Sequence, residues 1–135
     1  MTLVDSNVLL DLLTSDPKWG DWSSSAIESA AANGDLLIND IVYAELAVGF
    51  PTIEALDQFV ADVDLKVAPM PRSALYLAAK THLRYRQSGG TRTSVLPDFF
   101  VGAQAAVLNA TLLTRDARRF RTYFPTVELF SPGMD

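Results

Sequence analysis

The sequence contains no cysteine and only one histidine, His82. The absence of cysteine excludes disulfide bridges, thiol nucleophiles and zinc sites with thiolate ligands. A lone histidine also argues against zinc, because zinc sites combine several cysteine or histidine side chains. No partner that could orient His82 is evident in the sequence, so we do not expect it to act as a general base. The remaining candidate metal ligands are oxygen atoms.

Long apolar runs are also absent. No uninterrupted apolar stretch approaches the roughly 20 residues that a membrane-spanning helix needs. The first residues lack the basic and apolar regions of a secretion signal. A hydrophobic content of 49% with 20% charged residues is typical of a folded globular domain rather than a disordered chain. We therefore expect a single domain over residues 1–135, located in the cytoplasm and without membrane contact.

Basic residues are scarce in the first half of the chain. Residues 1–66 hold twelve acidic and two basic residues, whereas residues 67–135 hold nine basic and four acidic residues. The net charges of the two halves are thus −10 and +5, and seven of the bases are arginines between Arg84 and Arg121. These arginines could form a cationic face that binds phosphate. The alternative is an ordinary solvated surface.

Short apolar segments alternate with helical patterns along the whole chain. Strands are expected at residues 2–4, 36–38, 65–67, 111–114 and 127–130. Helices are expected at about residues 8–13, 23–32, 39–48, 53–63, 73–85 and 97–108. Strands separated in this way by helices indicate an α/β fold, with a parallel sheet, helices on both of its faces and right-handed crossovers.

Acidic residues recur where these strands and helices meet. Asp5 and Asp116 follow strands, Glu45 lies in the helix after the second strand, and Asp98 is in the first turn of an apolar helix. Open α/β sheets place ligands at the carboxyl ends of their strands, so all four acids could meet at one edge. Asp5 could equally be only the N-cap of the next helix. The helix dipole should lower the pKa of Asp98.

Four carboxylates at one edge would need protons or a cation. Each close pair repels by roughly 4 kcal/mol at an effective dielectric constant near 20. Oxygen ligands select hard cations, which predicts Mg²⁺ or Mn²⁺. Such a metal polarises a phosphoryl oxygen and lowers the pKa of a bound water that can attack phosphorus. The predicted metal ligands are Asp5, Asp98 and Asp116, and the predicted neighbours that orient the acids are Ser6, Asn7 and Thr114.

Four sequence segments resemble the motifs of the PIN-domain ribonucleases, and specifically of the VapC-type toxins of bacterial toxin–antitoxin pairs. The segments are LVDSNVLLD (3–11), IVYAEL (41–46), PDFFVGA (97–103) and LTRDARRF (113–120). The family's catalytic acids then fall on Asp5, Glu45, Asp98 and Asp116. Each motif is weak alone, but four in the same order and at family-like separations are a specific signal. No acid position departs from the pattern.

The resemblance implies a three-layer α/β/α sandwich and a Mg²⁺- or Mn²⁺-dependent endoribonuclease. It also implies a homodimer that acts as the toxin of a type II pair, with a cognate antitoxin protein that blocks the site. Apolar residues could form a groove for an antitoxin helix, or could be ordinary core: Trp22, Phe50, Leu56 and Phe59. Candidate contacts to RNA phosphates are Arg92, Arg115 and Arg118. The polar, glycine-containing stretch 87–94 is either a mobile substrate loop or a plain connection.

Two other functions use the same kind of sheet. A phosphoacceptor signalling domain needs an aspartate that ends a middle strand and a lysine late in the chain, but the last lysine is Lys80. A catalytically silent domain of this fold would only bind a partner, and the complete set of acids argues against it.

Overall fold

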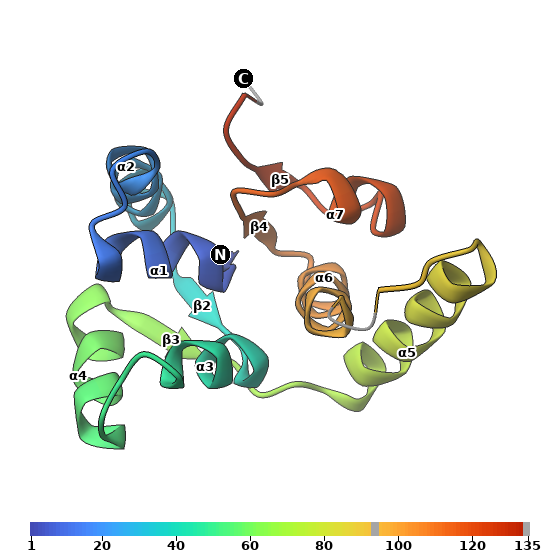
Figure 1. Ribbon diagram of the computed structural model, residues 1–135, viewed down its shortest axis with the longest axis horizontal. Coiled ribbons are helices and arrows are strands. Elements are labelled where there is room, and N and C mark those ends of the chain that lie inside the picture. Colours follow the sequence, from blue (N-terminus) through green and yellow to red (C-terminus); the bar gives the residue numbers. More distant parts are fainter. Residues whose placement is uncertain (93–94, 134–135) are drawn as a thin grey trace.

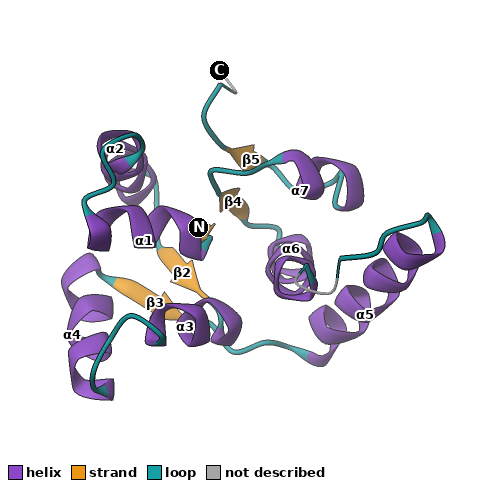
Figure 2. Cartoon of the chain, in the orientation of Figure 1, coloured by secondary structure: helices purple, strands orange, loops and turns teal. Residues whose placement is uncertain are grey.

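The computed structural model describes residues 1–92 and 95–133. Helices and short strands alternate through this part of the chain (Figures 1 and 2). The elements are β1 (Thr2–Val4), α1 (Ser6–Thr14), α2 (Gly20–Ala32), β2 (Leu36–Ile38), α3 (Asp40–Ala47), α4 (Ile53–Val63), β3 (Leu65–Val67), α5 (Arg72–Gln87), α6 (Leu96–Leu108), β4 (Thr111–Leu113), α7 (Arg118–Tyr123) and β5 (Leu129–Phe130). None of these helices is long and apolar enough to cross a membrane.

The five strands form one parallel sheet in the order β3-β2-β1-β4-β5. Leu3 in the central strand pairs with Leu37 on one side and Leu112 on the other. Helices α1 and α2 lie together on one side of the sheet, while α5 and α6 pack together on the other (Figure 1). The predicted α/β/α sandwich with a central parallel sheet is therefore confirmed.

Side-chain caps set where two helices begin at the carboxyl edge of the sheet. The carboxylate of Asp5 accepts a hydrogen bond from the backbone N–H of Ser6 at 2.8 Å, at the start of α1. The side chain of Asn39 accepts one from the N–H of Val42 at 2.9 Å, at the start of α3. Each cap satisfies a backbone donor that the helix leaves unpaired, so both helices start directly after their strands.

Helix α7 is not among the elements that the sequence pattern predicts. It is six residues long, and only Phe120 in it is buried, so it carries no helical repeat of apolar positions. Its place depends instead on packing against α6. Several expected boundaries also differ: α1 begins at Ser6, α2 begins at Gly20, β4 ends at Leu113, β5 begins at Leu129, and α5 continues to Gln87.

The contact between α6 and the segment after α7 requires a glycine. A Cβ atom on Gly102 would overlap the buried ring of Phe124. We expect Gly102→Ala to lower the free energy of unfolding by about 1–2 kcal/mol, because overpacking outweighs the gain in helix propensity. Urea unfolding checks this. Gly49→Ala is the matched control, because a Cβ there makes only ordinary van der Waals contact, and equal stability of both variants would contradict the prediction.

Candidate active site

The site is built around Asp5, which follows the central strand and is 5% exposed. Its Oδ1 caps α1, and its Oδ2 accepts a hydrogen bond from the hydroxyl of Thr114 at 2.8 Å. Thr114 follows β4, the neighbouring strand. The two interpretations of Asp5 from the sequence are thus compatible, since one oxygen caps the helix while the other belongs to a network at the sheet edge.

Glu45 and Asp98 come to this edge from two other helices. The hydroxyl of Ser6 donates to Oε1 of Glu45 at 3.2 Å. The carboxylate of Asp98, in the first turn of α6, forms an ion pair with Arg119 of α7. The negative charges of Glu45 and Asp98 both act on Asp5. The structure therefore brings three of the four predicted acids into one electrostatic cluster with a common neighbour.

Burial and mutual repulsion raise the pKa values of these acids. The pKa of Asp5 rises to about 7, mainly through burial; the charges of Asp98 and Glu45 contribute to this rise, and the hydrogen bonds from Thr114 and Ser6 oppose it. Burial and the charge of Asp98 likewise raise the pKa of Glu45, against the hydrogen bond from Ser6. The site lacks enough positive charge to neutralise all its carboxylates.

The prediction that the pKa of Asp98 is lowered is wrong. The helix dipole was expected to lower its pKa, but burial raises the pKa, the guanidinium of Arg119 opposes that rise, and the charge of Asp116 adds to it. Burial is the largest influence on the pKa of Asp98, because it removes the hydration of a full charge. The effect of Asp116 on Asp98 also connects the fourth acid to the cluster.

The predicted neighbours of the acids form one hydrogen-bond network. Nδ2 of Asn7 donates to the hydroxyl of Thr114 at 3.4 Å, and the N–H of Asp116 donates to the same oxygen at 3.2 Å. Oδ1 of Asn7 accepts from the N–H of Arg115 at 3.2 Å. Since Thr114 in turn donates to Asp5, the network links the ends of β1 and β4 and holds the backbone that carries Asp116.

The donor set of this cluster fits a hard divalent cation. It consists of oxygen atoms only, and no cation offsets the raised pKa values of Asp5 and Glu45. In the arrangement seen, no three histidine, cysteine or acidic side chains among residues 1–92 and 95–133 are close enough to form a metal site. In the same arrangement Oδ2 of Asp98 is paired with the guanidinium of Arg119.

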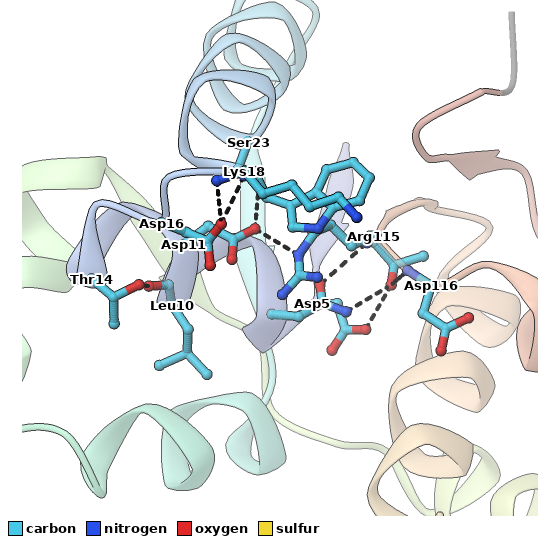
Figure 3. Close-up of polar contacts among 12 residues, drawn as sticks. Asp5, Leu10, Asp11, Thr14, Asp16, Lys18, Ser23, Arg115 and Asp116 are labelled. Carbon is cyan, nitrogen blue, oxygen red and sulfur yellow. Dashed lines mark hydrogen bonds and ion pairs between the residues drawn. The ribbon is translucent and has the colours of Figure 1, made fainter.

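The sequence reasoning missed one buried acid that lies outside the predicted set of four. Asp11 in α1 is 3% exposed, accepts a hydrogen bond from the hydroxyl of Ser23 at 2.7 Å, and lies 2.7 Å from Nε of Arg115 (Figure 3). The guanidinium of Arg115 also stacks on Trp19, 5.5 Å from the ring centre. The signal was available, because Asp11 interrupts an apolar run just as Glu45 does.

The three arginines predicted to bind phosphate line a single cavity of about 640 Å³, here called the arginine pocket. Its wall also includes Asp116, so the pocket adjoins the acid cluster. The arginines that line it are Arg92, Arg115, Arg118, Arg119 and Arg121. Arg115 is already paired with Asp11, whereas Arg92 and Arg118 form no ion pair within the described part of the chain. Local positive charge therefore exists in a protein that is acidic as a whole.

The four apolar residues considered for a partner groove do not lie together. Phe50 and Leu56 line a groove of about 260 Å³ between α3 and α4, and Phe59 contacts Phe50 at 5.6 Å between ring centres. Trp22 instead packs against Phe130, at 5.9 Å. The rim of the groove carries Ile53, which is 62% exposed.

Two further expectations concern the segment around α5. His82 packs against the rings of Tyr85 and Phe99, and its buried Nε2 has no hydrogen-bond partner in the described residues. This packing agrees with a structural role. The stretch 87–94, expected to be either a substrate loop or a plain connection, begins where α5 ends, but Thr93 and Ser94 lie outside the described residues.

The fold and the site define a class of α/β/α domain with an acid cluster at the carboxyl edge of its central strands. The family model described as PIN domain matches residues 2–124. The chain belongs to the PIN domain family. A comparison with curated proteins gives no significant match.

Solved structures share this fold along almost the whole chain. VapBC2 from Rickettsia felis, bound to a promoter DNA fragment, has a TM-score of 0.74 and 19% identity over 96% of this chain and 97% of that chain. VapBC-1 from nontypeable Haemophilus influenzae has a TM-score of 0.72 and 20% identity over 96% of both chains. FitAcB from Neisseria gonorrhoeae has a TM-score of 0.69 and 19% identity over 100% of both chains.

Proposed function

We propose that this protein is a metal-dependent endoribonuclease that hydrolyses RNA phosphodiester bonds as the toxin of a type II toxin–antitoxin pair. The observation that carries the proposal is the position of a carboxylate cluster with raised pKa values beside a pocket lined by arginines. The cluster suits a divalent metal and the pocket suits a phosphate backbone. The membership of the PIN domain family supports the same activity.

Asp5, Asp98 and Asp116 would hold Mg²⁺ or Mn²⁺, and Glu45 would orient the attacking water. When bound, the metal supplies Lewis-acid polarisation of the phosphoryl oxygen and a water of lowered pKa. The chain's own task is orientation: Thr114 directs one oxygen of Asp5, and Ser6 directs Glu45.

Arg92 and Arg118 are the proposed contacts to the RNA backbone. Both residues line the arginine pocket, as Asp116 does, and they form no ion pair within the described residues. Arg115 lines the same pocket, but its Nε faces Asp11. We therefore give Arg115 mainly a positioning role and a lesser part in phosphate binding.

Two protein partners belong to this proposal, a cognate antitoxin and a second copy of this chain. The similar structures from Rickettsia felis and Haemophilus influenzae are VapBC proteins, and a similar structure from Klebsiella pneumoniae is a toxin–antitoxin complex. The groove lined by Phe50 and Leu56 offers an apolar surface of the kind that accepts an amphipathic helix. Co-expression with the protein encoded next to this chain tests the antitoxin, and light scattering tests the dimer.

The alternative of a phosphoacceptor signalling domain does not agree with the topology. Receiver domains have the strand order 2-1-3-4-5, whereas this sheet has the order β3-β2-β1-β4-β5. Lys80 lies on α5 with its ammonium group over the ring of Tyr76, rather than after the last strands. A catalytically silent domain is the remaining alternative, and the following experiment separates it from a nuclease.

We expect Asp98→Asn to reduce RNA cleavage in Mg²⁺ buffer by at least about a hundredfold, because one metal ligand is lost. A chelator should have the same effect on the wild type. Gel analysis of a labelled RNA measures both, with Asp62→Asn on the exposed surface of α4 as the control. Cleavage that survives both the substitution and the chelator would refute the proposed function.

If the wild type cleaves RNA in this assay, sequencing of RNA ends after induced expression identifies the target.

A further inference from the structure

Arg119 belongs to two features of the molecule at once. One of its guanidinium nitrogens pairs with Oδ2 of Asp98, and the same side chain lines the arginine pocket. The Arg119 and Asp98 side chains are 22% and 33% exposed, so the ion pair is largely shielded from solvent. Arg119 therefore stands at the boundary between the carboxylate cluster and the proposed RNA-binding wall.

The two roles of Asp98 compete for its Oδ2 atom, which Arg119 holds in this structure. In the proposed function Asp98 serves as a metal ligand, and it can do so fully only after Arg119 leaves it. The guanidinium keeps its charge under all relevant conditions and, being partly buried, needs a new anionic partner. The anion that the adjoining pocket is proposed to take is an RNA phosphate, which accepts two hydrogen bonds from a guanidinium.

We propose that Arg119 exchanges between Asp98 in the metal-free protein and an RNA phosphate in the metal-bound protein. This inference rests on the proposed nuclease function. Arg119 thereby acts as an internal counter-ion that competes with the metal, and as a phosphate ligand that metal binding releases. Metal and RNA strengthen each other's binding, because each takes one of the two partners of the same ion pair.

The neighbouring residue Arg118 does not share this position. Arg118 lines the same pocket and carries the same charge, but it is exposed and forms no ion pair within the described residues. Removal of Arg118 therefore changes the charge of the pocket without freeing Asp98. Arg118→Gln is the matched control for Arg119→Gln.

The first measurement is the affinity for Mn²⁺ alone, by calorimetry. We expect Arg119→Gln to bind Mn²⁺ about tenfold more tightly than the wild type, within the usual range of coupling between two sites. Arg118→Gln should stay within about threefold of the wild type, which covers the long-range effect of losing one positive charge. Arg119→Lys, which keeps the charge but not the planar fork, should lie between the two. Equal Mn²⁺ affinities of the Arg119 and Arg118 variants would overturn the exchange.

The second measurement is binding of a short phosphorothioate RNA, by fluorescence anisotropy with and without Mn²⁺ and with gel analysis to confirm that the RNA is intact. The wild type should gain more affinity from Mn²⁺ than Arg119→Gln does, by about fivefold. Its salt dependence in Mn²⁺ should also be steeper than that of Arg119→Gln by about 0.7 in slope, the value for one contact to single-stranded RNA. Arg118→Gln should lose RNA affinity equally with and without Mn²⁺.

Failure of this inference is distinguishable from failure of the nuclease function. Asp98→Asn should lose most of its Mn²⁺ affinity if the acid cluster binds metal. If it does, and Arg119→Gln behaves like Arg118→Gln, the nuclease stands and the exchange is refuted. If Asp98→Asn binds Mn²⁺ as the wild type does, both are refuted.

Discussion

Replacement of Asp5 by asparagine is expected to stabilise the metal-free protein above neutral pH while it abolishes RNA cleavage. The pKa of Asp5 rises from 3.8 to about 7 on folding, mainly through burial. At about pH 8 the folded protein must therefore hold an ionised carboxylate in an unfavourable environment, at a cost of a few kcal/mol. Asparagine removes this cost but loses one hydrogen bond, so we expect a net gain of about 2 kcal/mol.

The sign of the pH dependence follows from the same shift. A folded-state pKa above the unfolded value means that the folded protein binds the extra proton, so stability falls as the pH rises from about 4 to about 7 and is constant beyond that. Urea unfolding in the presence of chelator, at a series of pH values, measures this. Asp5→Asn should flatten the fall, and Asp62→Asn should leave it unchanged. An Asp5→Asn profile that overlays the wild type would contradict the prediction.

The loss of Arg115 is expected to be the most destabilising single change of charge outside the acid cluster. Asp11 is buried, and beside Ser23 its charge is balanced by the guanidinium of Arg115 at 2.7 Å (Figure 3). Removal of one partner of a buried pair leaves an uncompensated charge, which costs about 3 kcal/mol. We expect Arg115→Gln to lower the free energy of unfolding by that amount.

Two further variants test the origin of this cost. Asp11→Asn combined with Arg115→Gln should recover part of the stability, because no unpaired charge then remains. Lys66→Gln breaks a surface pair with Asp35 whose side chains are 61% and 62% exposed, and should change stability by less than about 1 kcal/mol. If Arg115→Gln changed the free energy of unfolding as little as Lys66→Gln does, the buried pair would not contribute to stability.

The rate of RNA cleavage by Arg115→Gln should fall as well, since the backbone N–H of Arg115 donates to Asn7 and the chain continues directly into Asp116.

The buried strands and the apolar helices could be predicted because their signals are local. Leu3 and Val4 form an apolar segment that ends in an acid, and the same pattern recurs at Leu112 and Leu113 before Asp116. Helix α7 could not be predicted, because its position comes from contact with α6 rather than from its own apolar spacing.

The acids of the site could be predicted individually, but their electrostatic state could not. The position of Asp98 in the first turn of α6 suggests a lowered pKa, yet its burial raises the pKa. Desolvation depends on every atom that surrounds the carboxylate, and these atoms come from distant parts of the chain. The pairs of Arg119 with Asp98 and of Arg115 with Asp11 are hidden in the sequence for the same reason.

From its order of residues alone, this chain specifies an α/β sheet with acids after its strands, because strand propensity, helical spacing and caps act over a few neighbouring residues. Only the tertiary structure decided which side chains interact: Arg119 pairs with Asp98, Arg115 pairs with Asp11, and Thr114 donates a hydrogen bond to Asp5. These partners lie between 21 and 109 positions apart in the sequence. Their pairing depends on burial and distance, which exist only once the sheet has brought the ends of its strands together.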